Sequence, residues 1–360
     1  MRIVIAGGGT GGHLYPGIAV ARELLSRQPA AVISFAGTAH GIEARVIPRE
    51  GFALDLIRSG GLKGKSLAAR ARGAALLPVS LIDAWRIVTA RRPDLVIGVG
   101  GYSSGPVVLV AAIRGVATMV LEQNAVPGLT NRMLSRYVQA AAVAYESTRR
   151  FFGSKAFVSG NPVRPEFLDA GRGKESSQDA TTRRVLVFGG SQGAHAINVA
   201  MVEAAAGLAA QGPHLRLTHQ TGERDVEMVR AAYTQARLAA DVRPFLDDMG
   251  RQLGQADVVV CRAGATTIAE LTAAGRAAIL IPLPTATDDH QRKNAEALVA
   301  SGAADLLLQR DLNGRVLAER ILALAGDRPR RDRMAAAART LARPDAARVI
   351  VDRALELVKR

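Results

Sequence analysis

The stretch RIVIAGGGTGGHLYP, Arg2–Pro16, predicts the fold of the chain's first half. A β-branched run, Ile3–Ile5, leads directly into a loop that contains five glycines, and His13 follows them. A strand, a glycine turn and a helix in this order typically form a cradle for an anion, because glycines admit a ligand to the backbone and the helix start offers N–H groups. Three of the glycines match the G-x-G-x-x-G pattern, which favours a bound dinucleotide.

The second predicted strand argues against a dinucleotide. A dinucleotide-binding fold needs an acidic residue at the end of that strand, to accept hydrogen bonds from the ribose. Here the strand Val32–Ala36 continues into Gly37 and Thr38 without a carboxylate, so NAD is disfavoured. A further loop, SGGLKGKS (Ser59–Ser66), resembles a phosphate-binding NTPase loop but lacks its first glycine, and we interpret it as a flexible basic loop.

The composition fits a two-domain α/β protein. A chain of 360 residues is long enough for two domains. Apolar residues make up 48% of the chain and aromatic residues only 4%, as expected where Ala, Val and Leu fill buried parallel strands. The single cysteine, Cys261, excludes an intrachain disulfide and a cysteine-based metal site. Without a signal peptide or a membrane-spanning run, the chain is expected in the cytoplasm or at a membrane surface.

The net charge of +15 is unevenly distributed. Residues 1–160 hold 19 Lys and Arg against 8 Asp and Glu, or +11, and the remainder holds 28 against 24, or +4. This excess suggests that the first half meets nucleic acid or acidic lipid, with a solvated Arg-rich surface as the alternative. Nucleic acid is disfavoured because none of the 14 aromatic residues cluster among the basic ones for base stacking.

Strand-like and helix-like stretches alternate along both halves, which predicts two similar α/β domains with mostly parallel sheets. Two prolines, Pro162 and Pro165, mark the boundary between the halves. The predicted strands of the first half are Ile3–Ala6, Val32–Ala36, Leu54–Arg58, Leu95–Val99, Thr118–Leu121 and Ala140–Ala144, and its predicted helices are Leu14–Arg27, Leu67–Ala90, Gly105–Arg114 and Leu129–Arg136. The predicted strands of the second half are Val185–Phe188, Leu215–His219, Val242–Phe245, Val258–Val260, Ala278–Ile281 and Asp305–Leu308, and a last helix covers about Asp345–Lys359.

Polar loops follow the carboxyl ends of several predicted strands, which is where open α/β sheets bind their ligands. The turn at 261–270 suits a diphosphate at a helix start, and Glu270 could bind a ribose diol there, with a solvated carboxylate as the alternative. His13 could act as a base or contact a sugar hydroxyl, with a structural cap as the alternative. Asp288 and Asp289 lack the partners of a metal site, and we interpret them as helix caps.

Seven motifs, taken together and in order, closely resemble the MurG family of transferases, which add N-acetylglucosamine to the lipid-linked muramyl-pentapeptide of peptidoglycan synthesis. The motifs are GGGTGGHLYP (Gly7–Pro16), GGYSSGP (Gly100–Pro106), EQNAVPGLTN (Glu122–Asn131), GNPVR (Gly160–Arg164), GGSQGA (Gly189–Ala194), CRAGATTIAEL (Cys261–Leu271) and DDHQRKNA (Asp288–Ala295). The resemblance implies the GT-B fold, with two Rossmann-like domains facing across a cleft. It places residues 1–162 plus 343–360 in an acceptor-binding, membrane-associating domain and residues 163–342 in a UDP-sugar-binding domain.

The resemblance also implies roles for individual residues. His13 becomes the candidate base or a sugar contact, and Glu270 would take the ribose hydroxyls. Arg164 and the backbone of Leu246 would lie at the uracil end, while Gln291 and Asn124 would contact the sugar. The full set implied to bind UDP-N-acetylglucosamine is Thr10, Gly11, Gly12, Asn124, Arg164, Ser191, Leu246, Ala265, Thr266, Thr267, Ile268, Ala269, Glu270 and Gln291.

The implied reaction is an inverting transfer from UDP-N-acetylglucosamine to the C4 hydroxyl of the muramyl sugar of lipid I, without a cofactor or a resident metal. The implied partners are this donor, the lipid acceptor and an anionic membrane surface, with other cell-wall synthesis proteins as further candidates. The implied location is the cytoplasmic face of the inner membrane, at which the basic, Trp85-bearing segment 60–92 would dock. Leu121 and His195 depart from the family's usual His and Arg. A galactosyl-diacylglycerol synthase and a UDP-sugar epimerase remain alternative enzymes.

Overall fold

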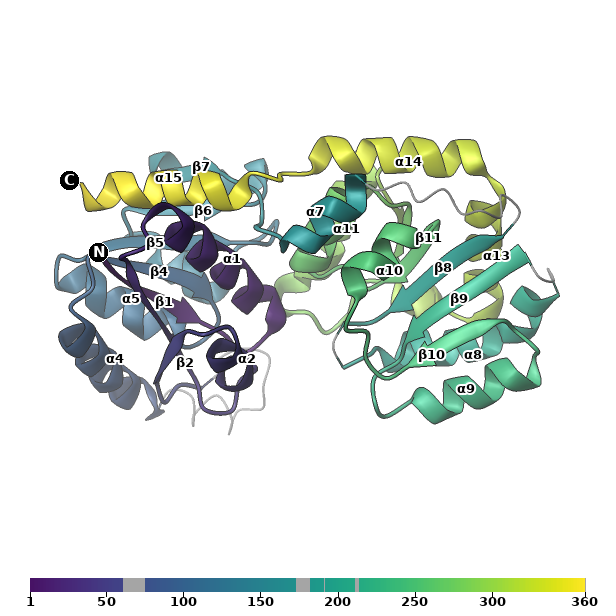
Figure 1. Cartoon of the computed structure of the whole chain (residues 1–360), viewed down its shortest axis with the longest axis horizontal. Coiled ribbons are helices and arrows are strands. Elements are labelled where there is room, and N and C mark those ends of the chain that lie inside the picture. The colour runs from purple at the N-terminus through teal and green to yellow at the C-terminus, as the bar shows by residue number, and fades with distance from the viewer. Residues whose placement is uncertain (61–74, 173–181, 191, 211–213, 360) are drawn as a thin grey trace. The chain divides into compact units, whose positions relative to one another are not determined.

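The computed structural model describes residues 1–60, 75–172, 182–190, 192–210 and 214–359 (Figure 1). The chain divides into two compact units, Met1–Arg164 with Arg343–Arg360, and Pro165–Ala342. The division follows Arg164, two residues after the boundary expected from the sequence, so Arg164 belongs to the first unit. Each unit is an α/β structure with a wholly parallel sheet, as the alternating pattern predicts.

The sheet of the first unit has seven strands in the order β3-β2-β1-β4-β5-β6-β7. The strands are β1 (Arg2–Gly7), β2 (Val32–Gly37), β3 (Ala53–Leu56), β4 (Leu95–Gly100), β5 (Ala117–Glu122), β6 (Ala140–Val143) and β7 (Ala156–Val158). The helices are α1 (Gly11–Arg27), α2 (Glu43–Arg49), α4 (Leu77–Arg91), α5 (Ser104–Ile113), α6 (Leu129–Leu134) and α15 (Ala346–Val358), and two 3₁₀ turns cover Glu146–Phe151 and Gly153–Lys155.

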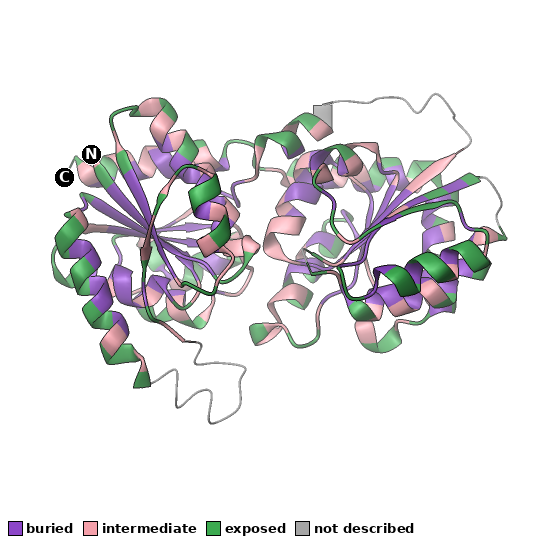
Figure 2. Cartoon of the chain, turned by 60° about the horizontal axis from the view of Figure 1, so that its bottom comes forward, coloured by how far each residue is buried: buried purple, intermediate pink, exposed green. Residues whose placement is uncertain are grey.

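Helices cover both faces of the first sheet. Successive side chains of its central strands point to opposite faces, so each strand contributes to two cores. Ile3 and Ile5 of β1 pack in the core that contains residues of α1 and α15. Val4 and Ala6 of the same strand pack in a second core, with residues of α4 and α5. Figure 2 shows the resulting layer of buried strands between partly exposed helices.

The sheet of the second unit has six strands in the order β10-β9-β8-β11-β12-β13. The strands are β8 (Arg183–Phe188), β9 (Leu215–Gln220), β10 (Ala240–Arg243), β11 (Val258–Cys261), β12 (Ala278–Leu280) and β13 (Asp305–Leu306). The helices are α7 (Pro165–Arg172), α8 (His195–Ala209), α9 (Val226–Gln235), α10 (Met249–Gln255), α11 (Ala265–Ala274), α12 (His290–Ala300), α13 (Gly314–Gly326) and α14 (Arg328–Leu341), with 3₁₀ turns at Thr287–Asp289 and Gln309–Asp311.

The strand orders locate the expected ligand edge in each unit. Strand order reverses between β1 and β4 in the first sheet, and between β8 and β11 in the second. Open parallel sheets bind ligands beyond the carboxyl ends of the strands at such a reversal. The glycine loops that follow β1 and β8 both lie at these points, so one candidate edge exists in each unit.

Four elements differ most clearly from the sequence prediction. β7 and α2 were not predicted, because a three-residue edge strand and a seven-residue helix containing Pro48 give little periodic signal. α1 begins at Gly11, earlier than the predicted Leu14, so His13 lies in its first turn. The strand predicted at Val242–Phe245 is Ala240–Arg243. Residues 67–74 of the helix predicted at Leu67–Ala90, and most of the basic loop Ser59–Ser66, lie outside the described residues.

Candidate active site

Two glycine loops pack against each other at the ligand edge of the first unit. Gly7, Gly8 and Gly9 follow β1 with φ of 151°, 153° and 83°, backbone conformations that side-chain-bearing residues rarely adopt. A β-carbon added at Gly101 would lie 2.6 Å from the carbonyl oxygen of Gly8. The contact between the loops after β1 and β4 therefore requires glycine at Gly7, whose β-carbon would lie 2.5 Å from Gly100 O, and at Gly101.

His13 follows the first of these loops, and its ring packs against the second. Its Nδ1 is 3.3 Å from Thr10 Oγ1. A β-carbon at Gly100 would lie 2.8 Å from His13 Cδ2 and 3.1 Å from Nε2, so the ring packs directly over that glycine. Thr10 precedes α1 in an extended conformation, and its side chain makes no capping hydrogen bond to the helix. Thr10, Gly11, Gly12 and His13 thus form one continuous turn at the start of α1, as the sequence predicts.

Asn124 is held at the same edge by the buried carboxylate of Glu122, the last residue of β5. Glu122 Oε1 accepts hydrogen bonds from Asn124 N at 3.0 Å and Asn124 Nδ2 at 3.2 Å. Its Oε2 accepts from Gly128 N at 3.0 Å and Asn131 Nδ2 at 2.9 Å. Burial raises the pKa of Glu122, and these hydrogen bonds oppose the rise. The carboxylate therefore fixes the loop between β5 and α6.

Replacing Glu122 by alanine is expected to lower the free energy of unfolding of the first unit by about 3 kcal/mol, because four N–H groups lose their acceptor. Urea unfolding followed by circular dichroism measures this loss. Glu146→Ala, which removes an exposed carboxylate paired with Arg149, is the matched control and is expected to cost under about 0.5 kcal/mol. Equal stability of the two variants would show that Glu122 does not support the loop.

Arg164 lies in the first unit, stacked on an aromatic ring of α1. Its guanidinium carbon is 4.8 Å from the centre of the Tyr15 ring, a cation–π geometry. The sequence prediction had placed Arg164 in the second domain, at the uracil end of the donor. The contact with Tyr15 connects the GNPVR motif to α1, two residues beyond His13.

In the second unit, a buried glutamine connects two predicted ligand loops. Gln220, at the end of β9, donates from Nε2 to Gly190 O at 2.7 Å. Its Oε1 accepts from Leu246 N at 3.2 Å, and the Leu246 side chain lies in the core. Sequence reasoning missed Gln220, although it ends a strand as Glu122 does. Ser191 of the same glycine loop lies outside the described residues.

A buried polar network supports the start of α8 behind this loop. His219 Nδ1 is 2.8 Å from Tyr233 Oη, and its Nε2 is 3.1 Å from Asn198 Oδ1. Asn198 donates in turn to Asp225, whose carboxylate is 2.9 Å from His195 Nδ1. Burial lowers the pKa of His219 to about 3, so this ring is neutral at physiological pH. His195, which departs from the family's usual Arg, is thus a partner of Asp225.

The start of α11 presents backbone and hydroxyl groups at the ligand edge of the second unit. Gly264 precedes α11 in an extended conformation, without a side-chain capping bond. Ala265, Thr266, Thr267 and Ala269 are half-buried, and the Ile268 side chain is buried. Glu270 is only 9% exposed, so the alternative of a solvated carboxylate is wrong. A helix start of this kind can bind an anion through its backbone N–H groups.

A buried arginine anchors the loop that leads from β12 to Gln291, the second residue of α12. Arg262 donates to Ile281 O at 3.0 Å and Pro282 O at 3.2 Å, and this anchor was not predicted from the sequence. Gln291 Oε1 accepts from Leu283 N at 3.0 Å, which holds the side chain at the start of α12.

The two aspartates of this loop have a left-handed backbone. Asp288 and Asp289 have φ of 55° and 54°, and Asp289 makes no side-chain capping bond to α12. The capping interpretation is therefore wrong for Asp289. The left-handed backbone of both residues reverses the chain before the helix. Among the described residues, no group of three or more His, Cys, Asp or Glu side chains could hold a metal ion.

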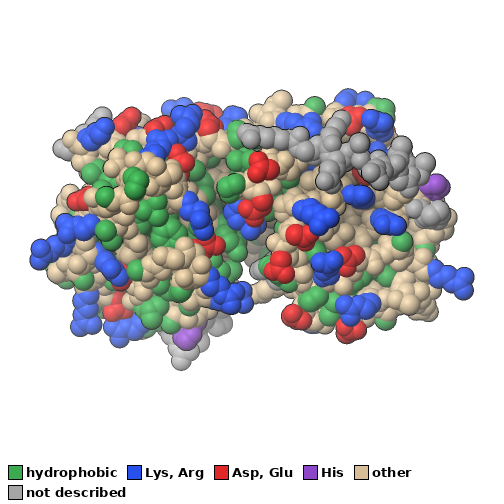
Figure 3. Space-filling view, in the orientation of Figure 1, with side chains coloured by type: hydrophobic (Ala, Val, Ile, Leu, Met, Phe, Trp, Pro, Cys, Tyr) green, Lys and Arg blue, Asp and Glu red, His purple; other side chains and the backbone are tan. Residues whose placement is uncertain are grey.

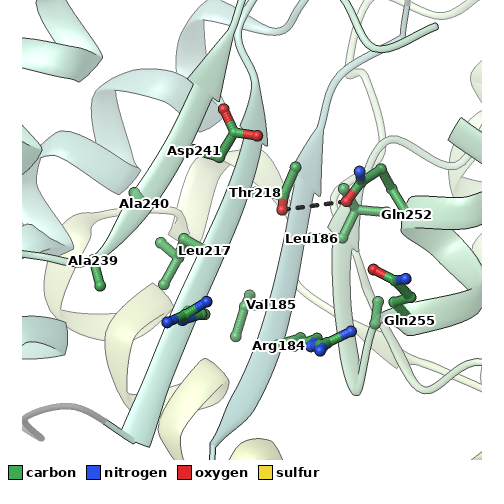
Figure 4. A pocket seen from close by; sticks show the side chains of 12 residues that line it. Arg184, Val185, Leu186, Leu217, Thr218, Ala239, Ala240, Asp241, Gln252 and Gln255 are labelled. Carbon is green, nitrogen blue, oxygen red and sulfur yellow. Dashed lines mark hydrogen bonds between the residues drawn. The ribbon is translucent and has the colours of Figure 1, made fainter. Parts of the chain in front are cut away.

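A separate hollow lies on one face of the second sheet (Figure 4). It has a volume of about 450 Å³ and is lined by the beginnings of β8 and β9, by β10 and by α10. Thr218 Oγ1 and Gln252 Oε1 are 3.4 Å apart across it. None of the predicted site residues lines this hollow, so it is distinct from the ligand edge at the carboxyl ends of the strands.

Comparison with known proteins identifies relatives over the whole chain. The glycosyltransferase family 28 N-terminal domain matches residues 3–143, and the C-terminal domain of that family matches residues 184–350. A UDP-N-acetylglucosamine–N-acetylmuramyl-(pentapeptide) pyrophosphoryl-undecaprenol N-acetylglucosamine transferase from Anaeromyxobacter sp. (strain K) is 49% identical over 361 residues, covering 100% of this chain and 94% of the relative.

Two solved structures are similar as well. The crystal structure of Acinetobacter baumannii MurG aligns with a TM-score of 0.79 and 33% identity, covering 99% of each chain. A UDP-GlcNAc 2-epimerase from Neisseria meningitidis aligns with a TM-score of 0.68 at 13% identity, covering 99% of this chain and 100% of the other. At that identity, the second likeness indicates a shared fold alone.

Proposed function

The chain belongs to the MurG family of N-acetylglucosamine transferases, and from this premise we propose the reaction that it catalyses. The enzyme transfers N-acetylglucosamine from UDP-N-acetylglucosamine to the C4 hydroxyl of the muramyl sugar of lipid I, giving lipid II. The observation that carries this proposal is 49% identity to such a transferase along the entire chain. The two parallel α/β units are those of the predicted GT-B glycosyltransferase fold.

The donor is assigned to the second unit. The start of α11 would bind the diphosphate through backbone N–H groups, supported by Ser191 of the glycine loop. Glu270 would accept hydrogen bonds from the ribose hydroxyls. Because Leu246 N already donates to Gln220, a uracil contact through this backbone falls to the Leu246 carbonyl oxygen. Gln291 Nε2 would contact the sugar, since Gln291 Oε1 already accepts from Leu283 N.

The acceptor and the catalytic base are assigned to the first unit. In the tautomer in which His13 Nδ1 donates to Thr10 Oγ1, Nε2 is the ring nitrogen that can accept a proton. Nε2 would take the proton of the acceptor hydroxyl as that oxygen attacks the anomeric carbon opposite the departing UDP, which inverts the configuration. The first-unit residues that would contact the sugar are Thr10, Gly11, Gly12 and Asn124. Arg164 would contact the uracil end of the donor.

A transfer assay tests this reaction. Purified enzyme is incubated with radiolabelled UDP-N-acetylglucosamine and either a lipid I analogue or diacylglycerol. Label is expected in the lipid I product alone, with the new glycosidic bond in the inverted configuration. Label in diacylglycerol would contradict the proposal in favour of a glycolipid synthase, and 2-epimerised sugar without transfer would favour an epimerase.

We also propose that α4 docks the first unit on an anionic membrane surface. Leu77, Leu81, Ile82 and Trp85 are exposed on this helix, at a spacing that places them along one side. The guanidinium carbon of Arg114 is 4.9 Å from the centre of the Trp85 ring, which adds a positive charge beside the apolar side chains. Figure 3 shows basic and apolar side chains together on the part of the first unit where Figure 1 draws α4.

Docking of this kind is peripheral, and it matches the first half's charge of +11. The described part of the chain has no helix with the length and apolarity needed to cross a bilayer. Segment 60–92 also contains Lys63, Lys65, Arg70 and Arg72, which lie outside the described residues.

Replacing Trp85 by alanine is expected to weaken binding to phosphatidylglycerol vesicles about tenfold, because the largest inserted apolar side chain is lost. Vesicle sedimentation measures the partition coefficient. Met228→Ala, on α9 of the second unit, removes a comparably exposed apolar side chain and is expected to leave binding unchanged. If both variants bind as the wild type does, α4 is not the docking surface.

A further inference from the structure

The first glycine loop already contains an anion, which the chain itself supplies. Gly9 N donates to Glu43 Oε2 at 2.8 Å. A backbone N–H between a first strand and its helix is the kind of donor that binds a ligand phosphate in nucleotide-binding α/β folds. Here that donor is used by a carboxylate 34 positions further along the chain.

The Glu43 carboxylate also connects this loop to the end of the neighbouring strand. Its Oε1 accepts from Thr38 N at 2.9 Å and from Thr38 Oγ1 at 2.8 Å. Thr38 directly follows β2, and β2 pairs with β1. The side chain is fully buried, so its three hydrogen bonds are shielded from water. Burial alone would raise the pKa of Glu43, but the hydrogen bonds from Gly9, from its own backbone N–H and from Thr38 outweigh it and lower the pKa.

The glycines around Glu43 make room for its carboxylate. A β-carbon added at Gly8 or Gly41 would collide with the Glu43 carboxyl group, and one at Gly37 would lie 2.5 Å from Glu43 Cγ. By contrast, a β-carbon at Gly9 would have no atom within 4 Å, so the outer side of the loop is open. The enclosed side of the cradle is therefore filled by protein, and only the Gly9 side can receive a ligand.

We propose that Glu43 is a positioning residue, which acts as the internal anion of the first glycine loop. It occupies the donor that a nucleotide diphosphate would otherwise use, and through Gly9 it fixes the backbone from which Thr10 and His13 extend. The expected effect of Glu43 on kcat rests on the proposed function, whereas its role in fixing the loop does not. It also gives a physical reason why the first loop should not bind a nucleotide, since the ligand would have to displace a buried carboxylate.

The test replaces Glu43 by alanine and supplies sodium formate, with sodium chloride at equal ionic strength as the reference. We expect kcat to fall about 100-fold and the KM for UDP-N-acetylglucosamine to stay within about threefold, because the base is displaced while the donor site is untouched. Formate fits the vacated position, so it should restore part of kcat and raise the melting temperature of the variant. The wild type should respond to formate in neither measurement.

Two further variants make the result specific. Glu43→Gln keeps the volume but places an NH₂ group against backbone donors, so we expect reduced kcat without rescue by formate. Glu203→Ala removes a similar bond, to Gly314 N in the second unit, and should show neither loss of kcat nor rescue. Wild-type kcat in Glu43→Ala, or a formate response equal to that of the wild type, would overturn the proposal. The melting-temperature response needs no substrate, so it tests Glu43 even if the proposed reaction is wrong.

Discussion

Replacing His13 by alanine is expected to lower kcat for transfer to lipid I about 1,000-fold, the loss typical for removal of a general base. The dissociation constant of UDP should change less than about twofold, because the nucleotide is assigned to the other unit. The structural basis is the position of the ring, which lies over Gly100 at the start of α1 with Nδ1 3.3 Å from Thr10 Oγ1. Steady-state kinetics and calorimetric titration with UDP measure the two quantities.

Two variants separate base chemistry from packing at this position. His13→Asn can keep a donor toward Thr10 but cannot act as a base, so it should be as inactive as the alanine variant. His214→Ala removes an exposed histidine of the second unit and should retain wild-type kcat. A His13→Asn enzyme with near-normal turnover would rule out His13 as the base.

Replacing Glu270 by alanine is expected to weaken UDP binding about 30-fold, which corresponds to about 2 kcal/mol for hydrogen bonds between a carboxylate and the ribose diol. The carboxylate is 9% exposed one turn into α11, so little water is available to replace the lost acceptor. The discriminating measurement compares UDP with 2′-deoxy-UDP. The wild type should bind UDP more tightly than the deoxy compound, and the variant should bind both equally.

Glu319→Ala serves as the control for this comparison. Glu319 lies on α13 and pairs with Arg315 on the protein surface, so its loss should change neither UDP affinity nor the preference for the ribose. If the Glu270→Ala enzyme still prefers UDP over the deoxy compound by the wild-type factor, another group binds the ribose diol.

The parallel sheets could be predicted from the sequence because their strands are short apolar runs followed by glycines or polar loops. β1 and β4 are buried almost throughout, and each ends in a glycine loop that the sequence makes visible. The same pattern predicts the ligand edge, since polar residues directly follow strands β5 and β11 and a polar loop begins at Thr285, a few residues after β12. These features depend on residues that are close together in the chain.

The contacts that the sequence did not predict depend on residues that are far apart or on backbone angles. Glu43 accepts a hydrogen bond from Gly9, 34 positions earlier in the chain. The nucleotide-binding pattern predicts an acidic residue only at the end of the second strand. Gly37 and Gly41, which both precede the start of α2, were the available signal. Gln220 and Arg262 likewise form hydrogen bonds with loops 19 or more residues away in the sequence. Asp289 was assigned as a cap because its left-handed backbone cannot be recognised from its side chain.

The central claim is that the second unit binds the nucleotide, while the first glycine loop holds its own carboxylate and presents His13. Hydrogen–deuterium exchange with and without UDP tests this division most directly. We expect the strongest protection in peptides that cover residues 264–270 and 282–291, which include the start of α11 and the loop that leads to Gln291. Protection confined to residues 7–13 would contradict it, because the nucleotide would then bind the loop that Glu43 is proposed to fill.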